Sequence, residues 1–526
     1  MRVLVLLAAL CLSLAQAQEV GRLLLLSFEG TEAPLEQLEV LKPSGFIFFP
    51  SNIASTVQVR ALTDNLRNDA SHSLLLGIDQ EGGIVSSFRP PEATLFPGNM
   101  ALGAAGDPVL ARRVGRALGQ ELAYAGLNLD FAPVSDVASR PENPIVGTRS
   151  FGSDPAAVGV LARAFAAGLE DAGVAAVAKH FPGHGATTQD SHEVLPRVEH
   201  SRVVLSRLEL PPFRTLIAAG VPALMSAHVV YPALDARPAT LSKPILTKLL
   251  RNDLGFRGVV ITDAMNMRAI TDHYGPGEAA IRSVQAGADL LLLVASPETQ
   301  REVYRALKEA VASGRLSRTR VREAISRTAR LAQQYRLREA LKPDYEAHER
   351  LAETVASRAA TLLWNDGVLP LRASQKVLVV APEPSGYGDA GHLGSFLKAE
   401  RSNVRSVLIS DEPTVNERAE TVRKAKAADV VVLASYHGFG PFPKGLATLE
   451  ASLAALSTPL VVVTLGRPDD LRHFTARPDA YAAVYGYREA NLRAGAALLL
   501  GMRPPSGQLP VRVGLFPRGA GLKGYD

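Results

Sequence analysis

Cysteine is almost absent from this chain of 526 residues, because the only one is Cys11. It lies in the apolar run of residues 3–14, which is followed by the small and polar residues 15–17. A short apolar core between a basic start and small residues is typical of a secretory signal peptide, so we expect residues 1–17 to be removed. The mature chain, from about Gln18, then has no disulfide, thiolate nucleophile or thiolate metal site. We expect the protein to be secreted or periplasmic.

Long hydrophobic runs and concentrated charge are also lacking. No other stretch reaches the roughly 18 uninterrupted apolar residues that a membrane-spanning helix needs, so we expect no stable membrane insertion. The net charge is only +5, and Lys and Arg are scattered among Asp and Glu. Without a basic block interleaved with aromatic residues, nucleic acid is not an expected partner. The length exceeds one ordinary domain, so we expect two.

The first part of the chain contains eight short strand-like runs, separated by segments with helical spacing of apolar residues. The runs are residues 22–27, 45–49, 74–78, 127–130, 174–178, 223–225, 258–261 and 288–293. Most are apolar at consecutive positions, as expected for parallel strands that are buried on both faces. Eight such units predict a (β/α)8 TIM barrel over residues 18–342.

Polar residues follow five of these runs, directly or within a few positions. They are Asp79, Asp136, the pair Lys179 and His180, the pair Ser226 and His228, and Asp263. The carboxyl ends of all strands in such a barrel open onto one face, which carries the active site. We therefore expect these side chains to gather around one mouth.

A second pattern begins after residue 342. Strand-like runs at 377–381, 404–409, 430–433, 461–465 and 481–484 alternate with helical stretches such as 417–427 and 447–456. This alternation predicts a C-terminal α/β sandwich domain over residues 343–526. A Gly-x-Gly-x-x-Gly motif at 386–391 stands several residues beyond its strand, so a loop is expected there rather than a dinucleotide site.

The loop after the fifth run carries the most informative chemistry. Asp190 and His192 are two residues apart, so the carboxylate can hydrogen-bond one ring nitrogen and leave the other facing a substrate. Cleavage of a glycosidic bond needs a proton donor to the leaving oxygen and a group opposite that stabilises or traps the oxocarbenium-like centre. His192 is a candidate for the first role and Asp263 for the second.

Long collinear motifs resemble the family 3 glycoside hydrolases, and specifically their β-N-acetylglucosaminidase branch. They are DQEGG at 79–83, NLDFAPVSDV at 128–137, GTRSFG at 147–152, the segment 179–192, and GFRGVVITDAM at 255–265. The segments 362–371 and 505–511 are similar to those of members with a C-terminal α/β sandwich. The resemblance implies a two-domain enzyme with its active site in the barrel, and a second domain that is structural or shapes the subsites.

This resemblance also implies roles for individual residues. Asp263 is the nucleophile of a retaining mechanism, and His192 is the acid/base, oriented by Asp190. The residues that bind the sugar in the −1 subsite are Asp79, Arg149, Lys179 and His180. One departure concerns specificity: this branch usually has arginine where the chain has Ile84 and Ser87, so we expect some sugar contacts to differ.

No metal or other cofactor is expected. His180 and His184 stand four apart, but further ligands at suitable spacing are not evident. The predicted function is a retaining exo-β-N-acetylhexosaminidase that acts on N-acetylglucosamine-containing glycans, namely peptidoglycan fragments or chitooligosaccharides. Alternatives are a β-glucosidase-like specificity or phosphorolysis and, from other classes, a metal-dependent amidohydrolase or a non-catalytic glycan-binding protein.

Overall fold

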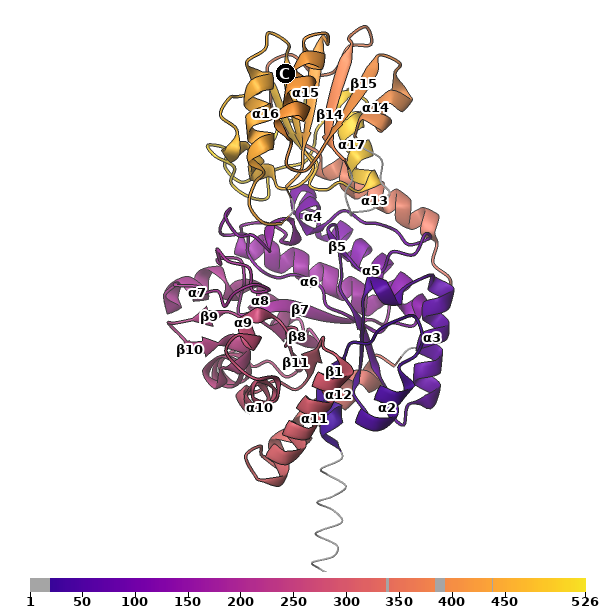
Figure 1. The fold of residues 1–526 in the computed structure, drawn as a ribbon, viewed down its shortest axis with the longest axis vertical. Coiled ribbons are helices and arrows are strands. Elements are labelled where there is room, and N and C mark those ends of the chain that lie inside the picture. Colours follow the sequence, from indigo (N-terminus) through magenta and orange to yellow (C-terminus); the bar gives the residue numbers. More distant parts are fainter. Residues whose placement is uncertain (1–18, 337–339, 384–392, 438) are drawn as a thin grey trace, which may run out of the picture.

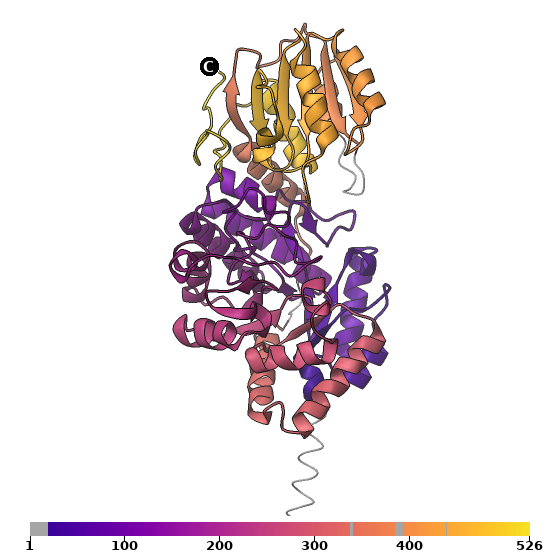
Figure 2. The same ribbon diagram turned by 60° about the vertical axis from the view of Figure 1, so that its left-hand side comes forward.

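The computed structural model describes residues 19–336, 340–383, 393–437 and 439–526 (Figure 1). The expected signal peptide and the whole glycine motif at 386–391 lie outside these residues. Two domains are stacked along the long axis of the molecule, as Figures 1 and 2 both show. No helix among the described residues is both long and apolar enough to cross a lipid bilayer.

The N-terminal domain is a barrel of eight parallel strands, in the order β11-β8-β7-β6-β3-β2-β1-β12. A bridge between Ile261 and Leu290 links the last strand to the first. The strands are β1 (Leu24–Leu26), β2 (Gly45–Phe48), β3 (Leu75–Ile78), β6 (Leu129–Asp130), β7 (Ala175–Phe181), β8 (Ala223–Ser226), β11 (Val259–Thr262) and β12 (Leu291–Leu293). Each coincides with a predicted run, so the TIM-barrel prediction is confirmed.

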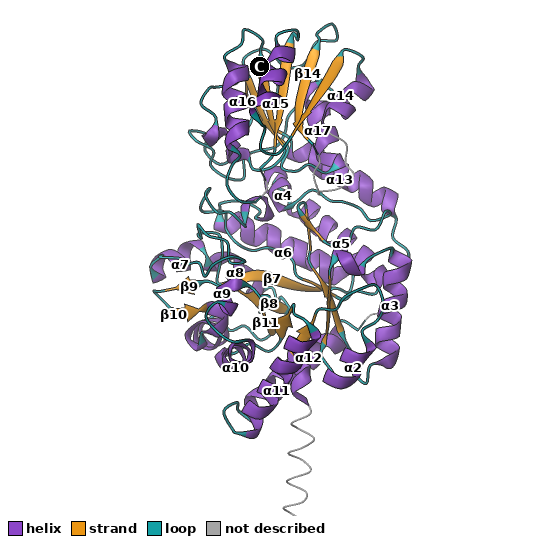
Figure 3. Cartoon of the chain, viewed as in Figure 1, coloured by secondary structure: helices purple, strands orange, loops and turns teal. Residues whose placement is uncertain are grey.

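Helices surround this barrel (Figure 3). They are α2 (Leu35–Leu41), α3 (Thr56–Asp69), α4 (Asn99–Ala105), α5 (Pro108–Ala125), α6 (Pro155–Asp171), α7 (Arg202–Leu208), α8 (Leu210–Ala218), the π-helix η5 (Pro244–Asp253), α9 (Arg268–Thr271), α10 (Pro276–Ala286), α11 (Pro297–Ala312) and α12 (Arg318–Gln334). Two helices show how local sequence sets where a helix begins. Asp107 and Asp154 cap α5 and α6 by accepting hydrogen bonds from backbone N–H groups, and both of these helices have proline in the first turn.

Short elements decorate the loops. The 3-10 turns are η1 (Glu19–Leu23), η2 (Pro50–Asn52), η3 (Gly147–Arg149) and η4 (Ala239–Leu241), and the two small hairpins pair β4 (Gln80–Gly82) with β5 (Val85–Ser86) and β9 (Val230–Tyr231) with β10 (Asp235–Pro238). The β4–β5 hairpin directly follows Asp79, so it carries the DQEGG motif to the mouth of the barrel.

Alternate residues of the barrel strands fill its interior. Ala175 and Val177 of β7 and Val259 and Ile261 of β11 belong to this inner cluster, together with Tyr335 next to α12. Successive side chains of a strand point to opposite faces, so the other residues of each strand pack outward against the helices. The carbonyl of Tyr335 accepts from Asn128, which precedes β6, so α12 closes the amino end of the barrel and leaves the carboxyl end open.

The C-terminal domain contains a six-stranded sheet in the order β13-β18-β17-β16-β14-β15. Its strands are β13 (Thr361–Asn365), β14 (Val377–Pro382), β15 (Val404–Ile409), β16 (Val430–Ser435), β17 (Leu460–Thr464) and β18 (Ala480–Ala483). The helical elements are α13 (Tyr345–Ala359), α14 (Leu393–Glu400), α15 (Val415–Ala425), α16 (Lys444–Ala454), η6 (Pro468–His473) and α17 (Glu489–Leu499). The predicted α/β architecture is confirmed.

Strand β13 was not among the predicted strands. It pairs antiparallel with β18, whereas the other pairs in this sheet are parallel. Trp364 of β13 is buried and stacks on Tyr481 and Phe516, with ring centroids 5.2 and 5.3 Å away. The strand is stabilised by partners more than 100 residues away, which local sequence periodicity does not reveal.

Candidate active site

The mouth of the barrel contains a network of buried charges. Lys179, in β7, places its Nζ 2.5 Å from Oδ1 of Asp79 and 2.7 Å from Oε1 of Glu81. Arg149 donates from Nε and Nη2 to the two carboxylate oxygens of Glu81, at 2.9 and 2.7 Å. Three of the predicted sugar-binding residues are thus tied together through one glutamate.

Glu81 is the centre of this network. Burial by itself raises its pKa, but the charges of Arg149 and Lys179 outweigh that effect and lower the pKa to about 2. Glu81 therefore stays ionised, and its negative charge offsets part of the positive charge of Arg149 and Lys179. Glu81 lies within the DQEGG motif, but no role was predicted for it from the sequence. The alternation of β4 could have revealed it, because residues 79 and 81 point to the same side of an extended segment.

The fourth predicted sugar-binding residue, His180, is held by Asp136. The His180 ring faces Oδ2 of Asp136 through Nδ1 at 2.7 Å, and Oδ1 accepts from the backbone N–H groups of His180 and His184 at 3.1 and 2.7 Å. A carboxylate only accepts, so Nδ1 of His180 carries the proton and Nε2 is left for other contacts. Asp136 is fully buried, and its pKa is lowered to about 2 because these groups outweigh the effect of burial.

The predicted Asp190–His192 pair is formed in the loop after β7. Oδ1 of Asp190 lies 2.7 Å from Nδ1 of His192 and also accepts from the His192 backbone N–H at 2.8 Å. The hydrogen bond to Asp190 raises the pKa of His192. The His192 side chain is 59% exposed, so its Nε2 edge is accessible from the mouth.

Asp263 stands at the carboxyl end of β11. Its Oδ1 accepts from the backbone N–H of Ala264 at 2.8 Å. Burial alone raises the pKa of Asp263, but the neighbouring His228 and His180 outweigh it, with a smaller effect from His192, so the pKa is lowered. A carboxylate held ionised beside a histidine whose pKa is raised is the arrangement that a nucleophile and a general acid require.

All seven predicted site residues lie at one end of the barrel. Some are in direct contact or share Glu81 as a partner, and others are close enough to shift one another's pKa. Their roles in catalysis remain predictions. Among the described residues, no group of three or more His, Cys, Asp or Glu side chains could hold a metal ion. His180 and His184, four apart in sequence, are instead both engaged by Asp136.

Two family models match this chain, one for each domain. Residues 17–331 match the family model described as the glycosyl hydrolase family 3 N-terminal domain, and residues 360–515 match that of the C-terminal domain. A solved structure of a glycoside hydrolase family 3 β-N-acetylglucosaminidase from a Paenibacillus species superposes with a TM-score of 0.90 at 37% identity, covering 94% of this chain and 98% of that one.

Two relatives of known sequence are named beta-hexosaminidase. Beta-hexosaminidase A of Pseudoalteromonas piscicida is 38% identical over 368 residues, which are 64% of this chain and 61% of that protein. A beta-hexosaminidase of Alkalilimnicola ehrlichii is also 38% identical, over 61% of this chain and 94% of its own length. The family matches span both domains and confirm the resemblance seen in the sequence. The chain belongs to glycosyl hydrolase family 3.

Proposed function

We propose that the protein is a retaining exo-β-N-acetylhexosaminidase that removes terminal N-acetylglucosamine from glycans. The observation that carries the proposal is the hydrogen-bonded pair of Asp190 and His192 beside the ionised Asp263, inside a family 3 barrel. The names of the relatives, β-hexosaminidase and β-N-acetylglucosaminidase, support this choice of sugar. Peptidoglycan fragments and chitooligosaccharides are the proposed substrate classes.

The reaction takes place in two steps. The Asp263 carboxylate attacks the anomeric carbon while Nε2 of protonated His192 donates its proton to the leaving glycosidic oxygen. Neutral His192 then takes a proton from water, which attacks the same carbon and releases Asp263. Two inversions leave the configuration unchanged. Asp190 keeps Nδ1 protonated throughout, so that Nε2 is the nitrogen that exchanges the proton.

The sugar is proposed to rest on the charged network described above. Lys179 and Arg149 present N–H donors, and Asp79 presents a carboxylate oxygen for ring hydroxyl groups. Glu81 does not need to touch the sugar, because it holds both cations in position. Each of these side chains is anchored by at least one partner, so the subsite is organised before the sugar arrives.

A chromogenic β-N-acetylglucosaminide, tested beside the matching β-glucoside, checks the activity. Wild type should prefer the N-acetyl substrate, Asp263→Asn should lose nearly all turnover, and Asp253→Asn, an exposed aspartate, should behave as wild type. A 5-fluoro N-acetylglucosaminyl fluoride should add one sugar mass to the protein, located on Asp263 by peptide mapping. Preference for the glucoside, or a label on another residue, would overturn the substrate or the mechanism.

The same assay tests phosphorolysis. Imidazole carries no negative charge when deprotonated, so it repels an attacking phosphate dianion less than a carboxylate does. Product analysis in phosphate buffer and in phosphate-free buffer separates the two reactions. Release of the free sugar at equal rates in both supports hydrolysis, whereas a sugar phosphate formed only with phosphate establishes phosphorolysis.

Export is part of the proposal and rests on the residues 1–17. Expression of the full chain in a bacterium with an outer membrane should place active protein in the periplasm or medium. Its amino terminus should begin near Gln18, and a variant without residues 2–17 should stay in the cytoplasm. An uncleaved amino terminus on periplasmic protein would contradict the predicted cleavage.

A further inference from the structure

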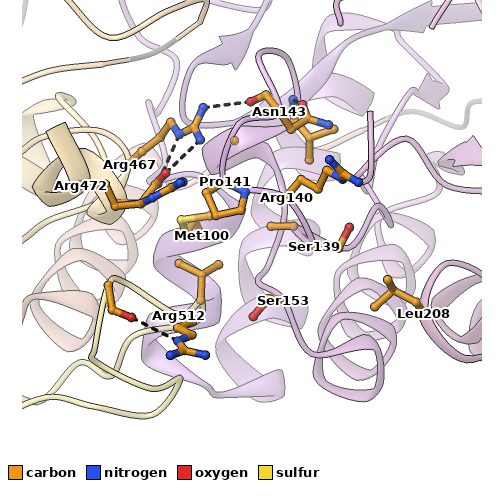
Figure 4. Close-up of a pocket in the computed structure, with 16 residues that line it drawn as sticks. Met100, Ser139, Arg140, Pro141, Asn143, Ser153, Leu208, Arg467, Arg472 and Arg512 are labelled. Carbon is orange, nitrogen blue, oxygen red and sulfur yellow. Dashed lines mark hydrogen bonds and ion pairs between the residues drawn. The ribbon is translucent and has the colours of Figure 1, made fainter. Parts of the chain in front are cut away.

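A pocket of about 480 Å³ is lined by residues of both domains (Figure 4). The barrel domain contributes Met100 of α4, seven of the residues 138–147 after β6, Ser153, and Leu208 of α7. The C-terminal domain contributes Arg467, which precedes η6, two residues of η6, and three residues of the segment 511–514. None of the seven predicted site residues lines it. Its volume is within the range of about 300–1,000 Å³ that small-molecule sites occupy.

Positive charge dominates the lining. Four arginines line the pocket, Arg140, Arg467, Arg472 and Arg512, against a single carboxylate, Asp469 (Figure 4). Such an excess of one sign in a concave site raises the local concentration of ions of the opposite sign.

Two of the arginines are already paired. Buried Arg467 donates from Nε and Nη2 to Asp469, at 3.3 and 3.0 Å. Arg472 pairs with Glu142 at 2.6 Å, on the solvent-exposed rim. These two side chains therefore shape the wall of the pocket more than they offer free donors.

The other two arginines retain unused donors. Arg512 donates from Nε to the carbonyl of Gly514 at 3.1 Å, which leaves its two Nη groups. The Arg140 guanidinium has neither a hydrogen bond nor an ion pair with any residue that the structure describes. Both side chains are exposed, so binding a ligand requires no buried contact to be broken. A guanidinium presents a planar fork of N–H donors that matches a carboxylate or a phosphate.

The remaining wall is partly apolar. Met100, Pro141, Val146, Leu208 and Val511 line the pocket between the arginines. A bare inorganic ion would leave this surface uncovered, whereas a ring-bearing molecule would contact it. We propose that the pocket binds a small organic anion, which carries a carboxylate or phosphate group on a body about the size of a sugar.

The pocket lies next to the loop that supports the acid/base pair. Arg467 donates from Nη1 to the carbonyl of Asn143 at 2.9 Å. The Asn143 amide donates to the carbonyls of His184 and Gly185 at 2.9 and 3.1 Å, and Nε2 of His184 lies 2.9 Å from Oγ of Ser191. These hydrogen bonds connect the wall of the pocket to the loop that carries Asp190 and His192.

Three sugars that share the glucose ring test the proposal. Glucose is neutral, glucuronate carries a carboxylate at C6, and glucose 6-phosphate carries a phosphate at the same position. Calorimetric titration at low ionic strength compares wild type, Arg140→Ala/Arg512→Ala, and Arg322→Ala as an exposed arginine far from the pocket. We expect the anionic sugars to bind wild type and Arg322→Ala equally, and to lose about tenfold or more in affinity in the double variant. Any affinity for glucose should be the same in all three proteins.

Binding of only one anionic sugar assigns the occupant as a carboxylate or as a phosphate ester. Equal affinity of both anions for wild type and the double variant, or failure of both to bind wild type, would overturn the site. Thermal melting checks that the double variant is folded, and the single variant Arg140→Gln repeats the test if it is not. The titration needs no turnover, so its outcome is independent of the proposed hydrolase activity.

Discussion

The guanidinium of Arg488, in the C-terminal domain, donates from Nε and Nη2 to the carbonyl oxygen of Gly83 in the barrel, at 3.1 and 2.9 Å. Gly83 ends the DQEGG motif that carries Asp79 and Glu81. Arg488 is only 1% exposed and also packs against the ring of Tyr487. A buried side chain of the second domain therefore contacts the motif that carries two members of the charged network, Asp79 and Glu81.

Replacing Arg488 by methionine should weaken both stability and catalysis. The change keeps an apolar stem but removes two donors from a buried carbonyl, which costs about 1–3 kcal/mol of unfolding free energy. The DQEGG turn loses its anchor, so kcat/KM should fall roughly tenfold or more. Urea denaturation and steady-state kinetics measure the two effects.

The matched control is Arg493→Met, on helix α17, which begins directly after Arg488. The Arg493 side chain is 53% exposed and pairs with Glu489 at the surface, so its loss should change stability by no more than about 0.5 kcal/mol. Equal effects of the two substitutions would show that the contact with Gly83 has no special role.

Asp190→Asn should move the alkaline limb of the pH profile to lower pH. His192 must be protonated to act as the acid, and its pKa is raised by the hydrogen bond and charge of Asp190. The uncharged amide of the variant lacks the negative charge, so His192 loses its proton at lower pH. The kcat also falls, because less of the enzyme carries the protonated acid. The profile of kcat/KM against pH measures the shift.

The acidic limb provides the internal control for this change. It should depend on Asp263, whose pKa is lowered by His228 and His180 against the effect of burial. It should therefore stay in place in Asp190→Asn. An alkaline limb that does not move would separate His192 from the proton transfer.

Glu81→Gln should destabilise the fold at neutral pH by about 3–5 kcal/mol, because it leaves the buried cations of Arg149 and Lys179 with less compensation. The pKa of Glu81 is about 2 in the folded chain, and about 4.3 in an unfolded one. Its stabilisation is thus complete above about pH 4.3 and is lost as the pH falls toward 2.

The difference in unfolding free energy between wild type and Glu81→Gln should therefore narrow between pH 5 and pH 3. Denaturant titrations across that range measure it. Glu353→Gln, an exposed glutamate on α13, should show little difference at any pH. A gap that stays constant would mean that the charge of Glu81 is not what stabilises the network.

Glu209 should have the opposite pH dependence. Both of its carboxylate oxygens are buried without a hydrogen bond in the described structure, and burial, aided by the charge of Asp136, raises its pKa to about 8. A raised pKa means that the folded state prefers the protonated form. The contribution of Glu209 to the unfolding free energy is therefore complete below about pH 4.3. It falls as the pH rises toward 8, by up to roughly 1.4 kcal/mol per pH unit.

Glu209→Gln cannot ionise, so it should gain stability relative to wild type as the pH increases from 5 to 8. Glu309→Gln, at an exposed position on α11, serves as the control and should follow wild type. Parallel curves for Glu209→Gln and wild type would show that Glu209 is already ionised in the folded protein.

Local sequence patterns were sufficient for the architecture of the barrel. Buried parallel strands appear as continuous apolar runs, and all eight predicted runs became barrel strands. Polar residues directly after those runs also placed most of the candidate site, because the carboxyl ends of barrel strands share one face. The spacing of Asp190 and His192 was sufficient to predict their hydrogen bond.

The sequence by itself thus determined the barrel, its open end and the Asp190–His192 pair, since each depends on periodicity or on neighbours in the chain. Only the tertiary structure decided the roles of Glu81 and Asp136, the antiparallel strand β13, and the contact of Arg488 with Gly83. That last pair is 405 residues apart. Contacts of this kind depend on how two domains pack together, and no local pattern encodes which side chain will meet which carbonyl.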